Sequence, residues 1–369
     1  MKQFLYSFVM LGLFVSFASG ADAKIWRLNN SNGQTLNPAI NADFTGTIQQ
    51  MHDDSRVQNG DTVHVEQSSY TYGSLTMTKR LIIIGPGYFQ NENPKTQVTK
   101  DYGATIGVLN ISSSAAAGSV ISGLSFSGSN IYLGADRLIF ENNYVTNVYT
   151  QIYIGSGNAT NIDSIVMRSN YIVANYAGYH PITVRPSTTG QISNFIFSNN
   201  IVSTGVLNNT TGLFLNSLFS GIIRNNTFYG GMNMFVYNMY VVNNLSNLST
   251  AGASGNGFEN CVLEYNMGVN NNQYVVPSRL NTNNTNTNNL TNVTQLLIGT
   301  GSTDGKWDLQ ASSPAKGAGK NGVDLGAFGG QIPYTLSGMP RVPNIYSISI
   351  APINPGASSI SVTVSAKSN

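Results

Sequence analysis

The stretch SNFIFSNNIVSTG, from Ser193 to Gly205, decides the fold of this chain. An apolar triplet, one spacer residue and two asparagines are followed at once by apolar residues again. Short runs rich in β-branched and aromatic residues are typical of β-strands. Asparagine tolerates the left-handed backbone conformation that a sharp bend between two strands requires. The stretch therefore predicts two short strands that meet at an asparagine corner.

The same phrase occurs six times along the chain, with an apolar residue at its third position and asparagine at its sixth. The six asparagines are Asn143, Asn170, Asn200, Asn226, Asn244 and Asn266. Units of this length are too short for paired helices, and each can bury its apolar face only against its neighbours. Stacked amides, which carry both donors and acceptors, can hydrogen-bond in a ladder. The sequence therefore predicts an all-β protein, a single-stranded parallel β-helix.

The ends of the chain suggest three segments. Lys2, an apolar run and small residues up to Ala23 predict a signal peptide over residues 1–23, and hence a secreted or cell-surface protein. The β-helix is expected over residues 24–332, with a capping helix at about 42–57. His52, Asp53 and Asp54 on that helix are interpreted as a solvated polar face rather than a metal site.

The last segment, residues 333–369, is expected to form tail strands that pack on the β-helix. The second repeat position should point outward, yet it is apolar six times, which would leave an exposed apolar strip. We predict that the tail covers this strip, which consists of Ile139, Val166, Ile196, Ile222, Tyr240 and Val262. The Asn-rich run from Asn281 to Asn292 is interpreted as a low-complexity loop.

Composition excludes several function classes. Only 9% of the residues are charged, the net charge is +2 and no basic run is present, which argues against nucleic-acid binding. Cys261 is the single cysteine, so no intrachain disulfide can form, and its apolar surroundings predict a buried, inert thiol. After the leader, no stretch is apolar enough to span a membrane. We expect a monomer without cofactor or metal.

A second strand in most turns presents a row of aromatic residues. If the aliphatic residues of these strands point inward, the two-residue period places one outward column at Tyr132, Tyr153, Thr183, Phe214 and Phe235. The next column consists of Gly134, Gly155, Arg185, Asn216 and Tyr237. Aromatic rings one strand apart could form a platform for sugar rings. The plain alternative is the general preference of aromatic residues for exposed sheets.

Several segments resemble a known family. The run GDTVHVEQSSYTYGSL, from Gly60, resembles the opening of β-helix proteins of the pectin lyase-like superfamily, and WDLQASSPAKGAGKNGVDLGAFGG, from Trp307, resembles their closing segment. The tail is similar to the ends of secreted β-helix proteins from Bacteroidota-type bacteria. The resemblance implies the right-handed parallel β-helix and an association with polysaccharides. One fold hosts many activities, so it does not identify the reaction.

The catalytic signatures of the family do not carry over. The repeats lack the acid cluster that holds Ca²⁺ in pectate lyases of this fold, and the outward positions assigned to the aromatic columns lack Asp and Glu. A glycosidase, which needs a carboxylate pair, is therefore not expected. His180 and Arg185 could serve a Ca²⁺-independent lyase, as base and as cation for a uronic-acid carboxylate. The candidate binding residues are Tyr132, Tyr153, Phe214, Asn216, Phe235 and Tyr237. A structural or adhesive surface protein without a site is the alternative.

Overall fold

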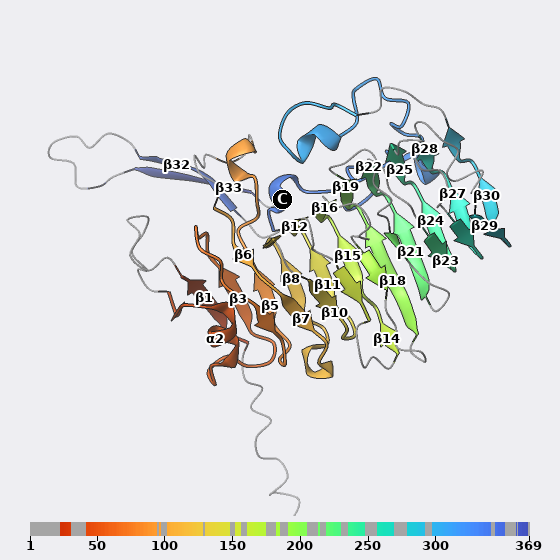
Figure 1. The fold of residues 1–369 in the computed structure, drawn as a ribbon. Helices are drawn as coiled ribbons and strands as arrows, with labels where there is room; N and C mark the ends of the chain where they lie inside the picture. The colour runs from red at the N-terminus through yellow and green to blue at the C-terminus, as the bar shows by residue number, and fades with distance from the viewer. Residues whose placement is uncertain are drawn as a thin grey trace, which may run out of the picture.

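The structure is a computed structural model in which parallel β-strands stack along one axis (Figure 1). It describes residues 23–30, 42–93, 96, 102–127, 130–147, 152–155, 161–174, 182–184, 191–204, 213–214, 219–229, 235–247, 257–268, 279–291, 297–340, 344–350, 359 and 361–367. From about Leu75 onward, the chain visits three parallel sheets in a fixed order and returns to the first with each turn. This is the all-β parallel solenoid that the repeats predict.

The three sheets are named A, B and C. Sheet A has thirteen strands: β1 (Ile25–Asn29), β2 (Phe44–Thr45), β3 (Thr62–Val65), β5 (Ile82–Ile84), β8 (Val120–Ser122), β11 (Ile139–Glu141), β14 (Ile162–Asp163), β15 (Val166–Arg168), β18 (Ile192–Ser198), β21 (Phe219–Arg224), β24 (Met239–Val242), β27 (Val262–Glu264) and β30 (Thr285–Thr287). Sheet B has nine: β4 (Leu75–Thr76), β7 (Leu109–Ile111), β10 (Ile131–Leu133), β13 (Ile152–Ile154), β17 (Ile182–Val184), β20 (Leu213–Phe214), β23 (Phe235–Tyr237), β26 (Gly257–Glu259) and β29 (Arg279–Thr282). Sheet C also has nine: β6 (Thr105–Ile106), β9 (Ser125–Ser127), β12 (Tyr144–Asn147), β16 (Tyr171–Ala174), β19 (Ile201–Thr204), β22 (Thr227–Tyr229), β25 (Leu245–Asn247), β28 (Met267–Gly268) and β31 (Leu290–Thr291).

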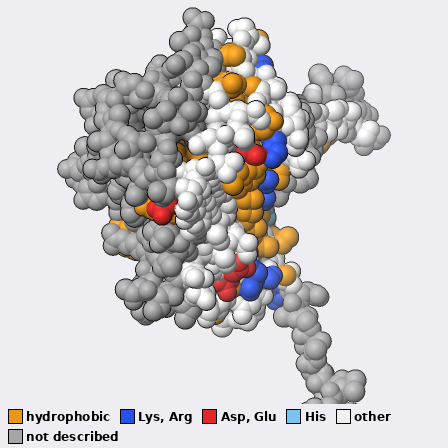
Figure 2. Space-filling view, turned by 90° about the vertical axis from the view of Figure 1, so that its right-hand side faces the viewer, with side chains coloured by type: hydrophobic (Ala, Val, Ile, Leu, Met, Phe, Trp, Pro, Cys, Tyr) orange, Lys and Arg blue, Asp and Glu red, His pale blue; other side chains and the backbone are white. Residues whose placement is uncertain are grey.

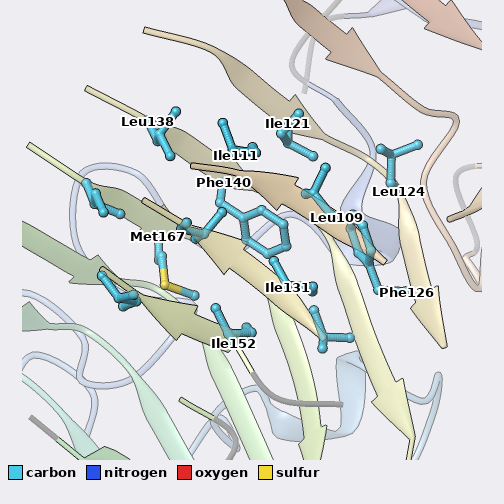
Figure 3. Packing of buried hydrophobic residues seen from close by; sticks show 14 of the residues in the cluster. Leu109, Ile111, Ile121, Leu124, Phe126, Ile131, Leu138, Phe140, Ile152 and Met167 are labelled. Carbon is cyan, nitrogen blue, oxygen red and sulfur yellow. The ribbon is translucent and has the colours of Figure 1, made fainter. Parts of the chain in front are cut away.

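The interior is filled by the inward residue of each short strand. In sheet A, Phe140 is in register with Ile121 and Met167, and all three are buried. Leu109 and Ile131 occupy equivalent rows of sheet B. Figure 3 shows these side chains meeting between the sheets. Each turn thus buries its apolar face on the turns above and below, as expected for a solenoid.

The two residues at each corner between sheets A and C, both asparagine in most turns, have different tasks. The first adopts the left-handed conformation, as in Asn199 and Asn225, whose φ angles are 56° and 52°. The second forms the asparagine ladder, which comprises the buried Asn143, Asn170, Asn200, Asn226, Asn244 and Asn266 and the partly buried Asn289 at its end. The predicted ladder is confirmed, and it is one residue longer than the six repeats.

Each rung of the ladder uses the amide completely. The backbone N–H of Asn200 donates to Oδ1 of Asn226 at 2.9 Å, and Nδ2 of Asn200 donates to the same oxygen at 3.0 Å. Nδ2 of Asn200 also donates to the carbonyl of Met167, in the preceding turn, at 3.0 Å. A polar side chain in the interior is tolerated here because its neighbours satisfy both its donors and its acceptor.

The N-terminal end carries the one α-helix among the described residues, α2 (Ile48–Asp53), directly after the short strand β2. Thr47 and Gln50 form a capping box at its start. Ile48 and Met51 are buried in the core, as the spacing predicts. His52, however, does not lie on a solvated face: it is buried, Nδ1 lies 2.7 Å from Asp53 Oδ1, and the backbone N–H of Thr78 donates to Nε2 at 3.1 Å.

The Asn-rich run at the other end is not a loop. Its residues form the last strands of the sheets, in which Thr285 is in register with Val262 and Leu290 with Met267. Asn284 and Asn289 accept hydrogen bonds from the backbone N–H groups of Cys261 and Asn266. The loop interpretation was wrong because it weighed composition alone, whereas pairing with the preceding turn determines the strand.

Residues 297–340, called the strap, contain little regular structure beyond 3-10 turns at η3 (Gly305–Trp307), η4 (Lys320–Gly322) and η5 (Leu336–Gly338). The other two 3-10 turns are η1 (Gln90–Glu92) and η2 (Ser114–Ala116). The strap runs back along the asparagine corner, from Asn243, which accepts from the Lys320 N–H, to Asn199, which donates to the carbonyls of Ala327 and Gly329. Residues 307–330, interpreted from the sequence as a closing segment, therefore lie over the outside of the solenoid.

The tail strands differ from the prediction. β32 (Asn344–Ile350) and β33 (Val362–Lys367) pair with each other in a separate antiparallel sheet, which extends away from the stack (Figure 1). The apolar strip of sheet A remains half-buried, and Val262 is 39% exposed. Figure 2 shows hydrophobic side chains gathered in a band with charged side chains beside them. The prediction assumed that the tail must bury its strands against sheet A, whereas they pair with each other.

Candidate functional site

The predicted aromatic column runs in register across the strands of sheet B. Tyr132 is in register with Tyr153, and the pairing continues through Thr183, Phe214 and Phe235 on the next three strands. Their neighbours in sequence, such as Ile131 and Ile152, are buried. The alternation of parallel strands thus brings residues 21 to 31 positions apart into one row, as the sequence predicts. We call this row, with Tyr237, the aromatic face.

Tyr132 and Tyr153 stack on each other. Their ring centroids are 5.1 Å apart, the planes differ by 12°, and both side chains are half-buried. Because the rings follow the strand spacing, their faces cover each other and their edges point outward. Nδ2 of Asn130 donates to the Tyr132 hydroxyl at 3.3 Å. This pair therefore offers ring edges and hydroxyl groups to a ligand, rather than the flat platform that was predicted.

The remaining predicted residues are described to different extents. His180, Arg185 and Asn216 lie outside the described residues. Phe214 and Phe235 are placed by their backbone, which sets them in register with each other. Tyr237 is half-buried and follows the inward residue Val236. The structure thus brings the described binding residues together on one sheet.

Sequence reasoning missed Glu259. It is in register with Tyr237 on the adjacent strand β26, and the buried Phe258 beside it shows that Glu259 faces outward. The positions assigned from the sequence end at Tyr237, one strand short of Glu259, so the face carries an acidic residue beyond the predicted columns. A signal was present: Tyr237-Asn238-Met239 and Glu259-Asn260-Cys261 share one pattern, in which the asparagine is left-handed and the next residue is buried.

Glu259 differs from every other acidic residue whose side chain is described. Each of the others accepts at least one hydrogen bond or forms an ion pair; examples are Glu141 with Arg168, Glu264 with Lys320 and Asp163 with Ser193. Across the described ranges, the Glu259 carboxylate has no hydrogen bond and no ion pair. Arg279, on the following strand, is in register with Gly257. Glu259 is half-buried, and it is the only charged side chain described on the outer face of sheet B.

Another polar cluster is internal. Asp304, which belongs to the strap, is fully buried and accepts from the Tyr334 hydroxyl at 3.1 Å and from the Ser337 backbone N–H at 2.5 Å. Burial raises the pKa of the Asp304 carboxyl above its ordinary value. The Tyr334 hydroxyl also lies 2.7 Å from that of Tyr88, and these contacts fix the strap to the loop after β5. This network has a structural task.

Cys261 is buried, as predicted, and burial raises the pKa of its thiol. Among the residues that the structure describes, no group of three or more His, Cys, Asp or Glu side chains is close enough to hold a metal ion. In the same ranges, no helix is long and apolar enough to cross a membrane. Among the described residues, the outer face of sheet B is therefore the candidate functional site.

Comparison with known proteins gives no relative: no family model, no curated protein and no solved structure matches this chain.

Proposed function

We propose that the protein binds a polysaccharide along the aromatic face. The observation that carries this proposal is the in-register row from Tyr132 to Phe235, which repeats once per strand over four strand spacings, about 19 Å. The repeat length of a polysaccharide chain is similar to the spacing between neighbouring strands. Successive sugar units can therefore meet equivalent positions on successive strands. Ring edges, hydroxyl groups and aromatic side chains suit the mixed polar and apolar surface of a sugar.

The proposal includes the resemblance to secreted right-handed β-helix proteins of the pectin lyase-like superfamily, with export through the signal peptide, α2 as the N-terminal cap and a monomeric state. A parallel β-solenoid with an outward aromatic row supports this proposal in its general form. In its catalytic form, His180 would remove a proton from a uronic acid and Arg185 would neutralise the carboxylate, without Ca²⁺. Binding alone does not require these two residues.

The test is a panel of neutral and uronic-acid polysaccharides, with retention of the protein and ultraviolet absorbance of unsaturated product measured in parallel. Tyr153→Ala should weaken retention about three- to tenfold, because it removes one ring and its hydroxyl from the row. Tyr70→Ala, which removes a 52% exposed tyrosine elsewhere in the chain, is the matched control and should bind like the parent protein. Equal retention by both variants would contradict the proposed face.

Absorbance that disappears in His180→Ala and Arg185→Ala would establish the lyase, whereas retention without absorbance would leave a binding protein. Neither signal on any glycan would favour the second candidate, a structural or adhesive protein of the cell surface. The specific observation behind that alternative is the ladder, which stiffens the solenoid without needing any ligand.

A further inference from the structure

Glu259 is the one acidic side chain whose carboxylate has no hydrogen bond or ion pair within the part of the chain that the structure describes. Its outward position follows from Phe258, which is buried at 1% exposure, and its strand is paired in register with β23. Neighbouring parallel strands lie about 4.8 Å apart, so the carboxylate and Tyr237 stand side by side on the surface. A half-buried carboxylate with no partner among the described residues can accept hydrogen bonds from a ligand without first breaking a contact with them.

The chemistry of this pair selects its ligand. An ionised carboxylate only accepts hydrogen bonds, and its two oxygens can accept from two adjacent hydroxyl groups. Tyr237 supplies an apolar ring and a hydroxyl beside it. A uronic acid at this position would place a second carboxylate near the first, and like charges at such a distance repel. A sugar with vicinal hydroxyl groups and no charge satisfies both residues.

We infer that Glu259 and Tyr237 form a subsite for an uncharged sugar unit, in which the carboxylate accepts from two hydroxyl groups and selects against uronic acids. This inference rests on the proposed function, and it names the class of glycan for this end of the aromatic face. It departs from the expectation of a polyuronate ligand, which relied on Arg185.

The experiment compares binding of the full chain to a neutral β-glucan, a neutral mannan, polygalacturonate and alginate by affinity electrophoresis. We expect a neutral glycan to be retained more strongly than either polyuronate. Glu259→Gln keeps the shape but weakens two charge-assisted hydrogen bonds, so neutral-glycan binding should fall about tenfold. The same variant should bind polyuronates at least as well as the parent, because the repulsive charge is gone.

Glu264→Gln is the matched control, because Glu264 is on the next strand but on sheet A, where it pairs with Lys320. It should leave glycan binding unchanged, and thermal unfolding of both variants shows whether they are folded. If a glycan is retained but Glu259→Gln binds it like the parent, or polyuronates are preferred, the subsite is overturned and the proposed function stands. If no glycan is retained at all, both are overturned.

Discussion

The asparagine corner and the aromatic face both repeat once per turn, but they use their polar groups in opposite ways. At the corner, each buried amide donates to and accepts from neighbouring turns at 2.8–3.0 Å. On the face, the Tyr132 and Tyr153 rings stack on each other, Asn130 donates to the Tyr132 hydroxyl, and the Glu259 carboxylate has no partner within the described ranges. A repeat whose polar groups are buried and satisfy one another builds a scaffold, whereas a repeat that holds its polar groups at the surface can present them to a ligand.

The largest effect is expected in the middle of the ladder. Asn226→Ala removes an oxygen that accepts from the backbone and side chain of Asn200 and a donor to the carbonyl of Phe197. The buried groups left behind cannot reach water, so the free energy of unfolding should fall by about 3 to 5 kcal/mol. Denaturant unfolding measures it. Asn110→Ala, on the outer face of sheet B, should lower the free energy of unfolding by less than about 0.5 kcal/mol. Similar losses for both variants would contradict the distinction between the corner and the face.

The next effect concerns the buried carboxyl of Asp304 in the strap. Because burial raises the pKa of Asp304 above its ordinary value of 3.8, the folded state favours the protonated form. Its contribution to stability is therefore present below pH 3.8 and is lost as the pH rises through the folded-state pKa. Asp304→Asn should remove this component from the pH dependence of the melting temperature.

Tyr334→Phe sharpens the same measurement. It removes a hydroxyl that donates to Asp304 and keeps the buried ring, so the pKa of Asp304 should rise further and the loss should move to higher pH. If the difference in melting temperature between the parent protein and Asp304→Asn is the same at every pH, the assignment of the shift to Asp304 is wrong.

A smaller effect is expected where the corner departs from its own pattern. Tyr265 occupies the left-handed position with a φ of 53°, where five of the other turns have asparagine: Asn142, Asn199, Asn225, Asn243 and Asn288. Tyr265→Asn should raise the free energy of unfolding by about 0.5 to 1 kcal/mol, because a bulky residue is strained in this conformation. Tyr237→Asn, in a regular strand of the aromatic face, should bring no gain. Thermal unfolding distinguishes the two.

The smallest effect separates paired from unpaired charges at the surface. Arg168 Nε lies 2.5 Å from Glu141 Oε2, and both side chains are partly exposed. Glu141→Gln should lower the free energy of unfolding by no more than about 0.5 kcal/mol, and less in high salt. Glu259→Gln should not change stability at all. A stability loss for Glu259→Gln would reveal a partner and weaken its assignment to a ligand.

The sequence alone was sufficient for the repeating parts of this fold. An apolar third position and an asparagine at the sixth predict a buried strand residue and a corner, and Phe197 and Asn200 are found as expected. The same two-residue period placed Tyr132 and Tyr153 in one column. These inferences hold because each turn repeats the environment of its neighbour, so that six similar phrases report on one local geometry.

Features that occur once depended on tertiary contacts. His52 is buried because β4 and the residues after it lie against α2, and the Asn-rich run is extended because Cys261 and Leu263 present a strand to pair with. The strap lies along the corner between sheets A and C, whereas the tail strands pair with each other.

The sequence by itself determined the period, the inward residues and the asparagine corner, since these depend on side-chain alternation and on the conformations open to asparagine. Only the tertiary structure decided that Glu259 stands beside Tyr237 with no hydrogen-bond or ion-pair partner for its carboxylate among the residues that the structure describes. The physical reason is that a hydrogen-bond partner in a parallel stack comes from the next turn, some 20 residues away, and local sequence does not specify it.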